Sequence, residues 1–83
     1  MTIDRFAWTA HAEMRLRQRG LARESVELAL RERHANREIN RGPADWRIEA
    51  GHFVVIYDHP DRGDPRTVRI VSVWAKRQEH RRS

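Results

Sequence analysis

WRIEAGHFVVIYD, residues 46–58, is the stretch that decides the fold class. From Trp46 to Ala50 every second residue is apolar, and the residues between them are charged. This period of two is typical of a β-strand that buries one face. Gly51 and His52 then favour a tight turn, and the apolar, β-branched run that follows predicts a second strand. The stretch therefore predicts a β-hairpin.

The strand pattern continues on both sides of this hairpin. TVRIVSVWA, at residues 67–75, is the strongest strand signal in the chain. DHPDRGDPR, at residues 58–66, is dense in Asp, Pro and Gly and predicts a loop. Residues 36–40 are consistent with a short edge strand. We therefore expect a meander of three or four antiparallel strands.

Two helices are predicted before the sheet. The first covers residues 10–19, where Thr9 is a cap, Trp8 an apolar anchor and Gly20 a stop signal. The second covers residues 23–34 and has its apolar positions on one face. This order predicts an α+β fold in which two N-terminal helices pack on one face of a three- to four-stranded antiparallel sheet. The opposite face of the sheet would be free to bind a ligand.

Length and composition limit the class of protein. Eighty-three residues predict a single small domain, residues 1–83, with a charged C-terminal tail over residues 76–83. The chain has no cysteine, which excludes a disulfide partner and thiolate chemistry. No run approaches the roughly 20 apolar residues that span a bilayer, and the N-terminus lacks the apolar core of a signal peptide. We therefore expect a cytoplasmic protein with no membrane partner.

The charge is basic, and nearly all of it is arginine. The net charge is +5, from 17 basic and 12 acidic residues, and Lys76 is the one lysine. A planar guanidinium binds two phosphate oxygens at once, so this composition favours a polyanion, with RNA as the expected partner. A GC-rich genome would also replace lysine by arginine, but the positive potential is the same in either case.

The most informative cluster is a stripe on the first predicted helix. His11, Arg15 and Arg19 are spaced four apart, so they lie on one side of the helix next to its apolar face. His11 falls in the first turn, where free N–H groups and the helix dipole favour an anion. A histidine and two arginines there would suit a phosphodiester. Alternatively, the arginine stems lie over the edge of the core and pair with carboxylates such as Glu49.

The strands supply further candidates. Tyr57 could donate a proton or a hydrogen bond, although a half-buried sheet aromatic explains it as well. Ser72 offers a hydroxyl, and Arg47, Arg69 and Lys76 are candidates for binding phosphate. Strand alternation puts Arg69 and Ser72 on opposite faces, so a bulge would be needed for both to line one site.

No metal or cofactor is expected. The loop after the hairpin contains Asp58, His59, Asp61 and Asp64 but lacks the glycine and glutamate positions of an EF-hand. A metal-free ribonuclease needs one group to take the 2′-hydroxyl proton, another to protonate the leaving oxygen, and cations to stabilise the transition state. Histidine, tyrosine and arginine can fill these roles.

The chain also resembles a bacterial domain-of-unknown-function family over roughly residues 9–77. Members of that family read His-Ala-x-x-Arg-x-x-x-Arg-Gly-Ile before a β-meander that ends in Val-Thr-Val-Trp. The corresponding helix residues here are His11-Ala12, Arg15 and Arg19-Gly20-Leu21. Ala22 departs from the usual Ser or Thr cap of the second helix.

That family looks related to toxins of the BrnT and RelE/ParE type, and more broadly to barnase-like and colicin-like ribonucleases. The resemblance implies a RelE-like fold, cleavage of mRNA or tRNA without a metal, and a protein antitoxin that blocks the site. By carry-over, His11 is the acid–base residue, Arg15 and Arg19 hold phosphate, and Ser72 keeps the hydroxyl of the family's threonine. Some ParE-like relatives act on gyrase instead, so kinship of fold leaves the activity open.

Together these features predict a small basic toxin-type endoribonuclease. Its catalytic candidates are His11, Tyr57 and Ser72. Two alternatives stay open, namely a non-catalytic module that binds nucleic acid or protein, and an inhibitor of a host enzyme such as gyrase.

Overall fold

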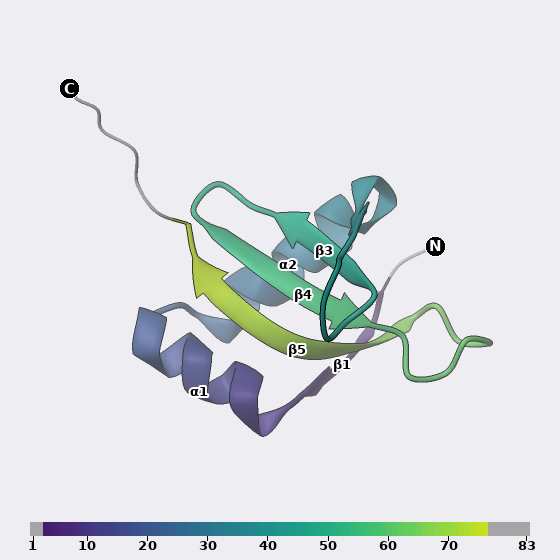
Figure 1. Ribbon diagram of the computed structural model, residues 1–83, viewed down its shortest axis with the longest axis horizontal. Helices are drawn as coiled ribbons and strands as arrows, with labels where there is room; N and C mark the ends of the chain where they lie inside the picture. Colours follow the sequence, from purple (N-terminus) through teal and green to yellow (C-terminus); the bar gives the residue numbers. More distant parts are fainter. Residues whose placement is uncertain (1–2, 77–83) are drawn as a thin grey trace.

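The computed structural model describes residues 3–76, which form two helices and a five-stranded sheet in an α+β fold (Figure 1). The elements follow in the order β1 (Arg5–Trp8), α1 (Ala10–Arg19), α2 (Arg23–Arg33), the 3-10 helix η1 (His34–Asn36), β2 (Glu38–Ile39), β3 (Trp46–Glu49), β4 (Phe53–Asp58) and β5 (Thr67–Ala75). Both predicted helices are confirmed, and so are the strands predicted after them. None of the helices within residues 3–76 is long and apolar enough to cross a membrane.

The sheet differs from the prediction in strand number and in strand direction. Its order is β1-β5-β4-β3-β2, and β1 pairs with β5 in parallel while the other neighbours are antiparallel. The predicted strands β2 to β5 do pair antiparallel, but the expected count of three or four strands and the purely antiparallel sheet are wrong, because β1 adds a fifth, parallel strand. In β1, Phe6 and Trp8 are half-buried while the residues between and before them are exposed, but only four residues carry this alternation. The partner of β1 is β5, at the far end of the described chain, so the local sequence pattern gives little indication that these two strands pair.

Both helices pack on the same face of the sheet, as predicted. One buried cluster contains Leu16 of α1 and Val26 and Leu30 of α2. The same cluster takes alternate residues from the longer strands, namely Phe53, Val55, Tyr57, Val68, Ile70 and Val73. The core therefore lies between the two helices and one sheet face. Ile3, just before β1, is fully buried in it.

Thr9 joins α1 to the sheet. Its hydroxyl oxygen accepts from the N–H of Ala12 (3.1 Å), which caps the helix as predicted. The same hydroxyl lies 2.9 Å from the carbonyl oxygen of Ile70 and 3.2 Å from that of Val71, so its proton is donated to β5. Gly20 ends the helix at φ 66°, in the left-handed region that glycine enters at the lowest cost.

A bulge in β5 lies at the point that Thr9 contacts. The register of β4 and β5 shifts there, and Val71 has no partner on β4. Arg69 pairs with Asp58 and Ser72 with Ile56. Because these two β4 residues are two apart, Arg69 and Ser72 both lie on the sheet face opposite the helices. By strand alternation, Arg69 and Ser72 could share one face only if the strand contained a bulge, and that bulge is present. The predicted basic tail beyond Lys76 lies outside the described residues.

Candidate functional site

A hollow of about 490 Å³, here called the sheet-end cavity, lies where β3 begins and β4 ends. It is lined by Arg37 after η1, by Asp45 and Trp46 at the start of β3, and by His59, Arg62 and Pro65 of the β4–β5 connection. Figure 1 shows this connection, in light green, projecting from one end of the sheet. Two guanidinium groups and an imidazole face a single carboxylate there, so the cavity favours an anion.

Arg37 is held in place before any ligand arrives. Its guanidinium carbon lies 4.1 Å from the centroid of the Trp46 ring, which is a stacked cation–π contact. One terminal nitrogen donates to the carbonyl oxygen of His34 (3.1 Å), while the buried Nε has no partner among residues 3–76. Since one face of the guanidinium lies on Trp46 and Nε is buried, Arg37 can offer a ligand its other face and its second terminal nitrogen.

His59 is oriented by the backbone. Its Nδ1 lies 3.0 Å from the carbonyl oxygen of Thr67. A carbonyl can only accept, so Nδ1 carries the proton and Nε2 is the nitrogen left to accept one. The imidazole also meets the Tyr57 ring edge-on, with centroids 6.1 Å apart at 79°. His59 is half-buried and lines the cavity, which suits an acid–base group.

Tyr57 lies beneath these residues. Its side chain is fully buried in the core, and its hydroxyl has no hydrogen-bond partner among the described residues. Burial raises the pKa of Tyr57 to about 12, against a smaller lowering by the positive charge of Arg37. The hydroxyl is therefore protonated at neutral pH, and it does not reach the surface in this conformation.

The loop that carries Arg62 is fastened by its own carboxylates. Asp61 accepts from the N–H of Gly63 (2.9 Å), and Asp64 accepts from the hydroxyl of Thr67 (2.8 Å). The hydrogen bond from Thr67 lowers the pKa of the Asp64 carboxyl. These side chains thus shape the turn, and within residues 3–76 no three His, Asp or Glu side chains converge as a metal site would require.

The predicted stripe lies on another part of the molecule. His11 and Arg19 are exposed on α1, and Arg15 is half-buried and donates to the side chain of Gln18 (3.4 Å). In Figure 1, α1 extends away from the light green connection, so the stripe and the sheet-end cavity are separate surfaces. The roles given to the three stripe residues stay predictions.

The other predicted phosphate-binding residues are already paired with carboxylates. Arg69 donates to both oxygens of Asp58, at 3.1 and 2.7 Å, and this hydrogen bonding raises the pKa of Arg69. Arg47 lies 2.6 Å from the carboxylate of Glu49, and the Nζ of Lys76 lies 3.4 Å from it. Glu49 therefore forms its ion pairs with Arg47 and Lys76, and not, as the alternative interpretation of the sequence suggests, with the arginines of α1. A phosphate would have to compete with these contacts.

The predicted catalytic residues are not brought together. Tyr57 belongs to the core on the helix side of the sheet, whereas Ser72 is buried on the opposite side. His11 is at the start of α1. The three side chains thus occupy three different environments.

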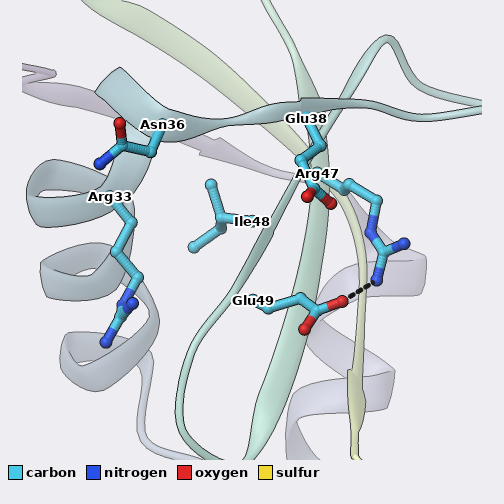
Figure 2. A pocket seen from close by; sticks show the side chains of 6 residues that line it. All are labelled: Arg33, Asn36, Glu38, Arg47, Ile48 and Glu49. Atoms are coloured by element: carbon cyan, nitrogen blue, oxygen red, sulfur yellow. Dashed lines mark hydrogen bonds and ion pairs between the residues drawn. The ribbon is translucent and has the colours of Figure 1, made fainter.

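A second, smaller hollow of about 180 Å³ lies between the end of α2 and β3. Its lining residues are Arg33, Asn36, Glu38, Arg47, Ile48 and Glu49. Figure 2 shows Ile48 at the centre between the helix and the strand, with the ion pair of Arg47 and Glu49 to one side. Two arginines face two glutamates here, so the charges nearly cancel and an anion gains little.

Sequence reasoning missed most of the sheet-end cavity. It did not single out Arg37 or Arg62, and it weighed His59 only as a metal ligand. One signal was present, since His59 directly follows a strong strand and begins a polar loop. The approach of Arg37 to this loop depends on the chain path after α2, which no local pattern shows.

Comparison of the chain with protein-family models, with curated proteins and with solved structures finds no match. The resemblance to BrnT and RelE/ParE toxins therefore stays a prediction. What the protein does is inferred below from the cavity itself.

Proposed function

We propose that the protein binds RNA in the sheet-end cavity and cleaves it without a metal ion, with His59 as the acid–base group. The observation that carries the proposal is the contact between Nδ1 of His59 and the carbonyl of Thr67 (3.0 Å), which leaves Nε2 for a substrate proton. Arg37 and Arg62 line the same cavity. An oriented imidazole beside two guanidinium groups suits transphosphorylation of an RNA phosphodiester.

In this mechanism Nε2 of His59 accepts the proton of a ribose 2′-hydroxyl while that oxygen attacks the adjacent phosphorus. The bond from phosphorus to the 5′-oxygen breaks, and the products are a 2′,3′-cyclic phosphate and a 5′-hydroxyl. The leaving 5′-oxygen lies on the opposite side of phosphorus and takes its proton from water, and the imidazolium of His59 afterwards returns its proton to the solvent. The Thr67 carbonyl accepts a hydrogen bond from Nδ1–H of His59 whether the imidazole is neutral or protonated, so it also stabilises the imidazolium.

The two arginines supply the positive charge that the transition state needs. Negative charge grows on the non-bridging oxygens of phosphorus as the 2′-oxygen attacks, and guanidinium groups stabilise it by paired N–H donors. Arg37 is already ordered by its contact with Trp46 (4.1 Å), so little side-chain entropy is lost when it binds. Tyr57 acts as a positioning residue, because its ring supports His59 while its hydroxyl stays buried.

Three histidine variants test the assignment. We expect His59→Ala to lower RNA cleavage by about 10²- to 10⁴-fold, the usual contribution of one acid–base group, without loss of the fold. His52→Ala is the matched control, because His52 is exposed in the turn before β4. His11→Ala tests the stripe on α1. Loss of cleavage in His11→Ala but not in His59→Ala would move the active site to α1.

A second function remains in competition, namely RNA binding without cleavage. It is favoured by the fully buried hydroxyl of Tyr57, because this hydroxyl cannot serve beside His59 as a second proton-transfer group. A wild-type protein that binds RNA in low salt but cleaves none between pH 5 and 9 would establish this function instead.

For the role in the cell, we propose a toxin whose cavity is covered by a protein antitoxin. The support is the resemblance of the helix motif described above. Conditional expression followed by mapping of RNA 5′ ends is the direct test. Growth arrest with new ends that disappear in His59→Ala is expected, whereas arrest without new ends would favour inhibition of a host enzyme such as gyrase.

A further inference from the structure

One carboxylate, that of Asp45, lies among the cations of the sheet-end cavity, where its oxygens can accept hydrogen bonds from a ligand. Asp45 is exposed and lines the cavity together with Arg37 and Arg62. No ion pair within 4.0 Å joins it to either arginine or to any other cation of residues 3–76. A bare phosphate would be attracted by the arginines and repelled by Asp45. The cavity therefore fits a ligand that is anionic at one end and carries N–H donors at the other.

Arg37 adds a flat surface to this cavity. Its guanidinium is stacked on Trp46 (4.1 Å) and tied to the His34 carbonyl (3.1 Å). Nucleobases stack on such planes as they do on aromatic rings. Since one face of the guanidinium already lies on the indole, the opposite face is the one a base would use. Pro65 adds an apolar wall.

We propose that the sheet-end cavity holds a guanine base of RNA, stacked on Arg37 and read by the carboxylate of Asp45. This inference rests on the RNA-binding function proposed above. Guanine is the base whose edge presents two adjacent donors, N1–H and the N2 amino group, which match the two oxygens of a carboxylate. Adenine and cytosine present one amino group beside an acceptor. Uracil presents one N–H between two carbonyls, which a carboxylate repels.

The same placement assigns the neighbouring phosphate. With the base on the face of Arg37 and against Asp45, its phosphate contacts the remaining polar side chains of the cavity, Arg62 and His59, while Arg37 adds its positive charge from the side of the base. Cleavage would then follow guanosine, whose own 2′-hydroxyl gives its proton to His59. Asp45 is a specificity-determining residue in this scheme and takes no part in proton transfer.

Binding of short RNAs tests the base reading separately from catalysis. The probes are fluorescent five-nucleotide RNAs of uridine with G, A, C or U at the centre, 2′-O-methylated at the centre so that they cannot be cleaved. We expect the guanine probe to bind roughly 5- to 150-fold more tightly than the others, the range for one bidentate base contact. In Asp45→Asn this preference should disappear, while the all-uridine probe binds as well as before or better.

Glu38→Gln is the matched control, because Glu38 is an exposed carboxylate that lies outside this cavity. It should keep the full preference. Arg37→Lys keeps the charge but removes the plane, so it should weaken the guanine probe more than a probe with an abasic centre. Salt-sensitive binding of all four probes with equal affinity would overturn the guanine site and leave RNA binding intact. Absence of binding to every probe would overturn the proposed function itself, and a preference retained in Asp45→Asn would exclude Asp45 as the reader.

Discussion

The hydroxyl of Tyr57 is fully buried and has no hydrogen-bond partner among residues 3–76. Leaving such a group unpaired costs about 1–3 kcal/mol, whereas the ring itself contributes buried apolar area. The sequence pattern proposed a catalytic hydroxyl at this position. Because the hydroxyl of Tyr57 is buried, the part of this side chain that contacts the cavity residues is its ring, which packs against the imidazole of His59 (6.1 Å between centroids).

Tyr57→Phe should therefore stabilise the protein by about 1 kcal/mol, because it removes an unpaired polar group and keeps the packing. Urea unfolding of the two proteins measures the difference. His59 keeps its ring contact in this variant, so RNA cleavage should change little. A less stable Phe variant would mean that the hydroxyl is hydrogen-bonded, for instance to a buried water.

The stability of the protein should also fall in strong base because of Tyr57. Burial raises its pKa from 10.0 to about 12 in the folded state. A raised pKa means that the unfolded chain loses this proton first, so the associated stability is complete below pH 10 and is lost as the pH rises toward 12. The difference in unfolding free energy between wild type and Tyr57→Phe should therefore grow in favour of the Phe variant over this interval. A constant difference would show that the phenol is not desolvated.

Among the elements, α1 depends on one side chain at its start. The hydroxyl of Thr9 caps the helix through Ala12 (3.1 Å) and contacts the carbonyls of Ile70 (2.9 Å) and Val71 (3.2 Å) at the bulge of β5. Thr9→Ala should cost about 1–2 kcal/mol, at the upper end for a lost cap. Thr9→Ser keeps the hydroxyl and should recover most of that loss in thermal unfolding. Equal destabilisation by both changes would point to the methyl group instead.

The start of α2 offers the converse experiment. Its N-cap residue, Ala22, is in an extended conformation (φ −88°, ψ 137°) and makes no side-chain cap. Ala22 is also exposed, so a serine can be added without disturbing the core. Ala22→Ser should stabilise the protein by about 0.5–2 kcal/mol in urea unfolding. No gain would mean that water already satisfies the first N–H groups of the helix.

For the molecule as a whole, the question is which of two basic surfaces meets RNA. Each phosphate contact to single-stranded nucleic acid contributes about −0.7 to the slope of log K against log salt. Arg62 lines the sheet-end cavity and Arg19 is exposed on α1. Arg62→Ala should make the slope shallower by about 0.7 and Arg19→Ala should leave it unchanged. The opposite result would assign the RNA-binding surface to α1.

The α+β class and the boundaries of the helices and the longer strands follow from the sequence alone, because they depend on periodicity, on the cap at Thr9 and on the stop at Gly20. These signals act over a few residues and are visible in one dimension. The stripe of His11, Arg15 and Arg19 could likewise be placed on one side of a helix, although its role could not.

Tertiary structure decided the rest, since it depends on contacts between distant parts of the chain. The parallel pairing of β1 with β5 made the sheet mixed, and the bulge at Val71 set which strand residues share a face. Arg37 and Arg62 were two arginines among many until the chain path brought them to one cavity beside His59. An arginine's usefulness depends on its nearest partner: a carboxylate occupies Arg69, whereas the aromatic ring that holds Arg37 leaves its charge free for an anion.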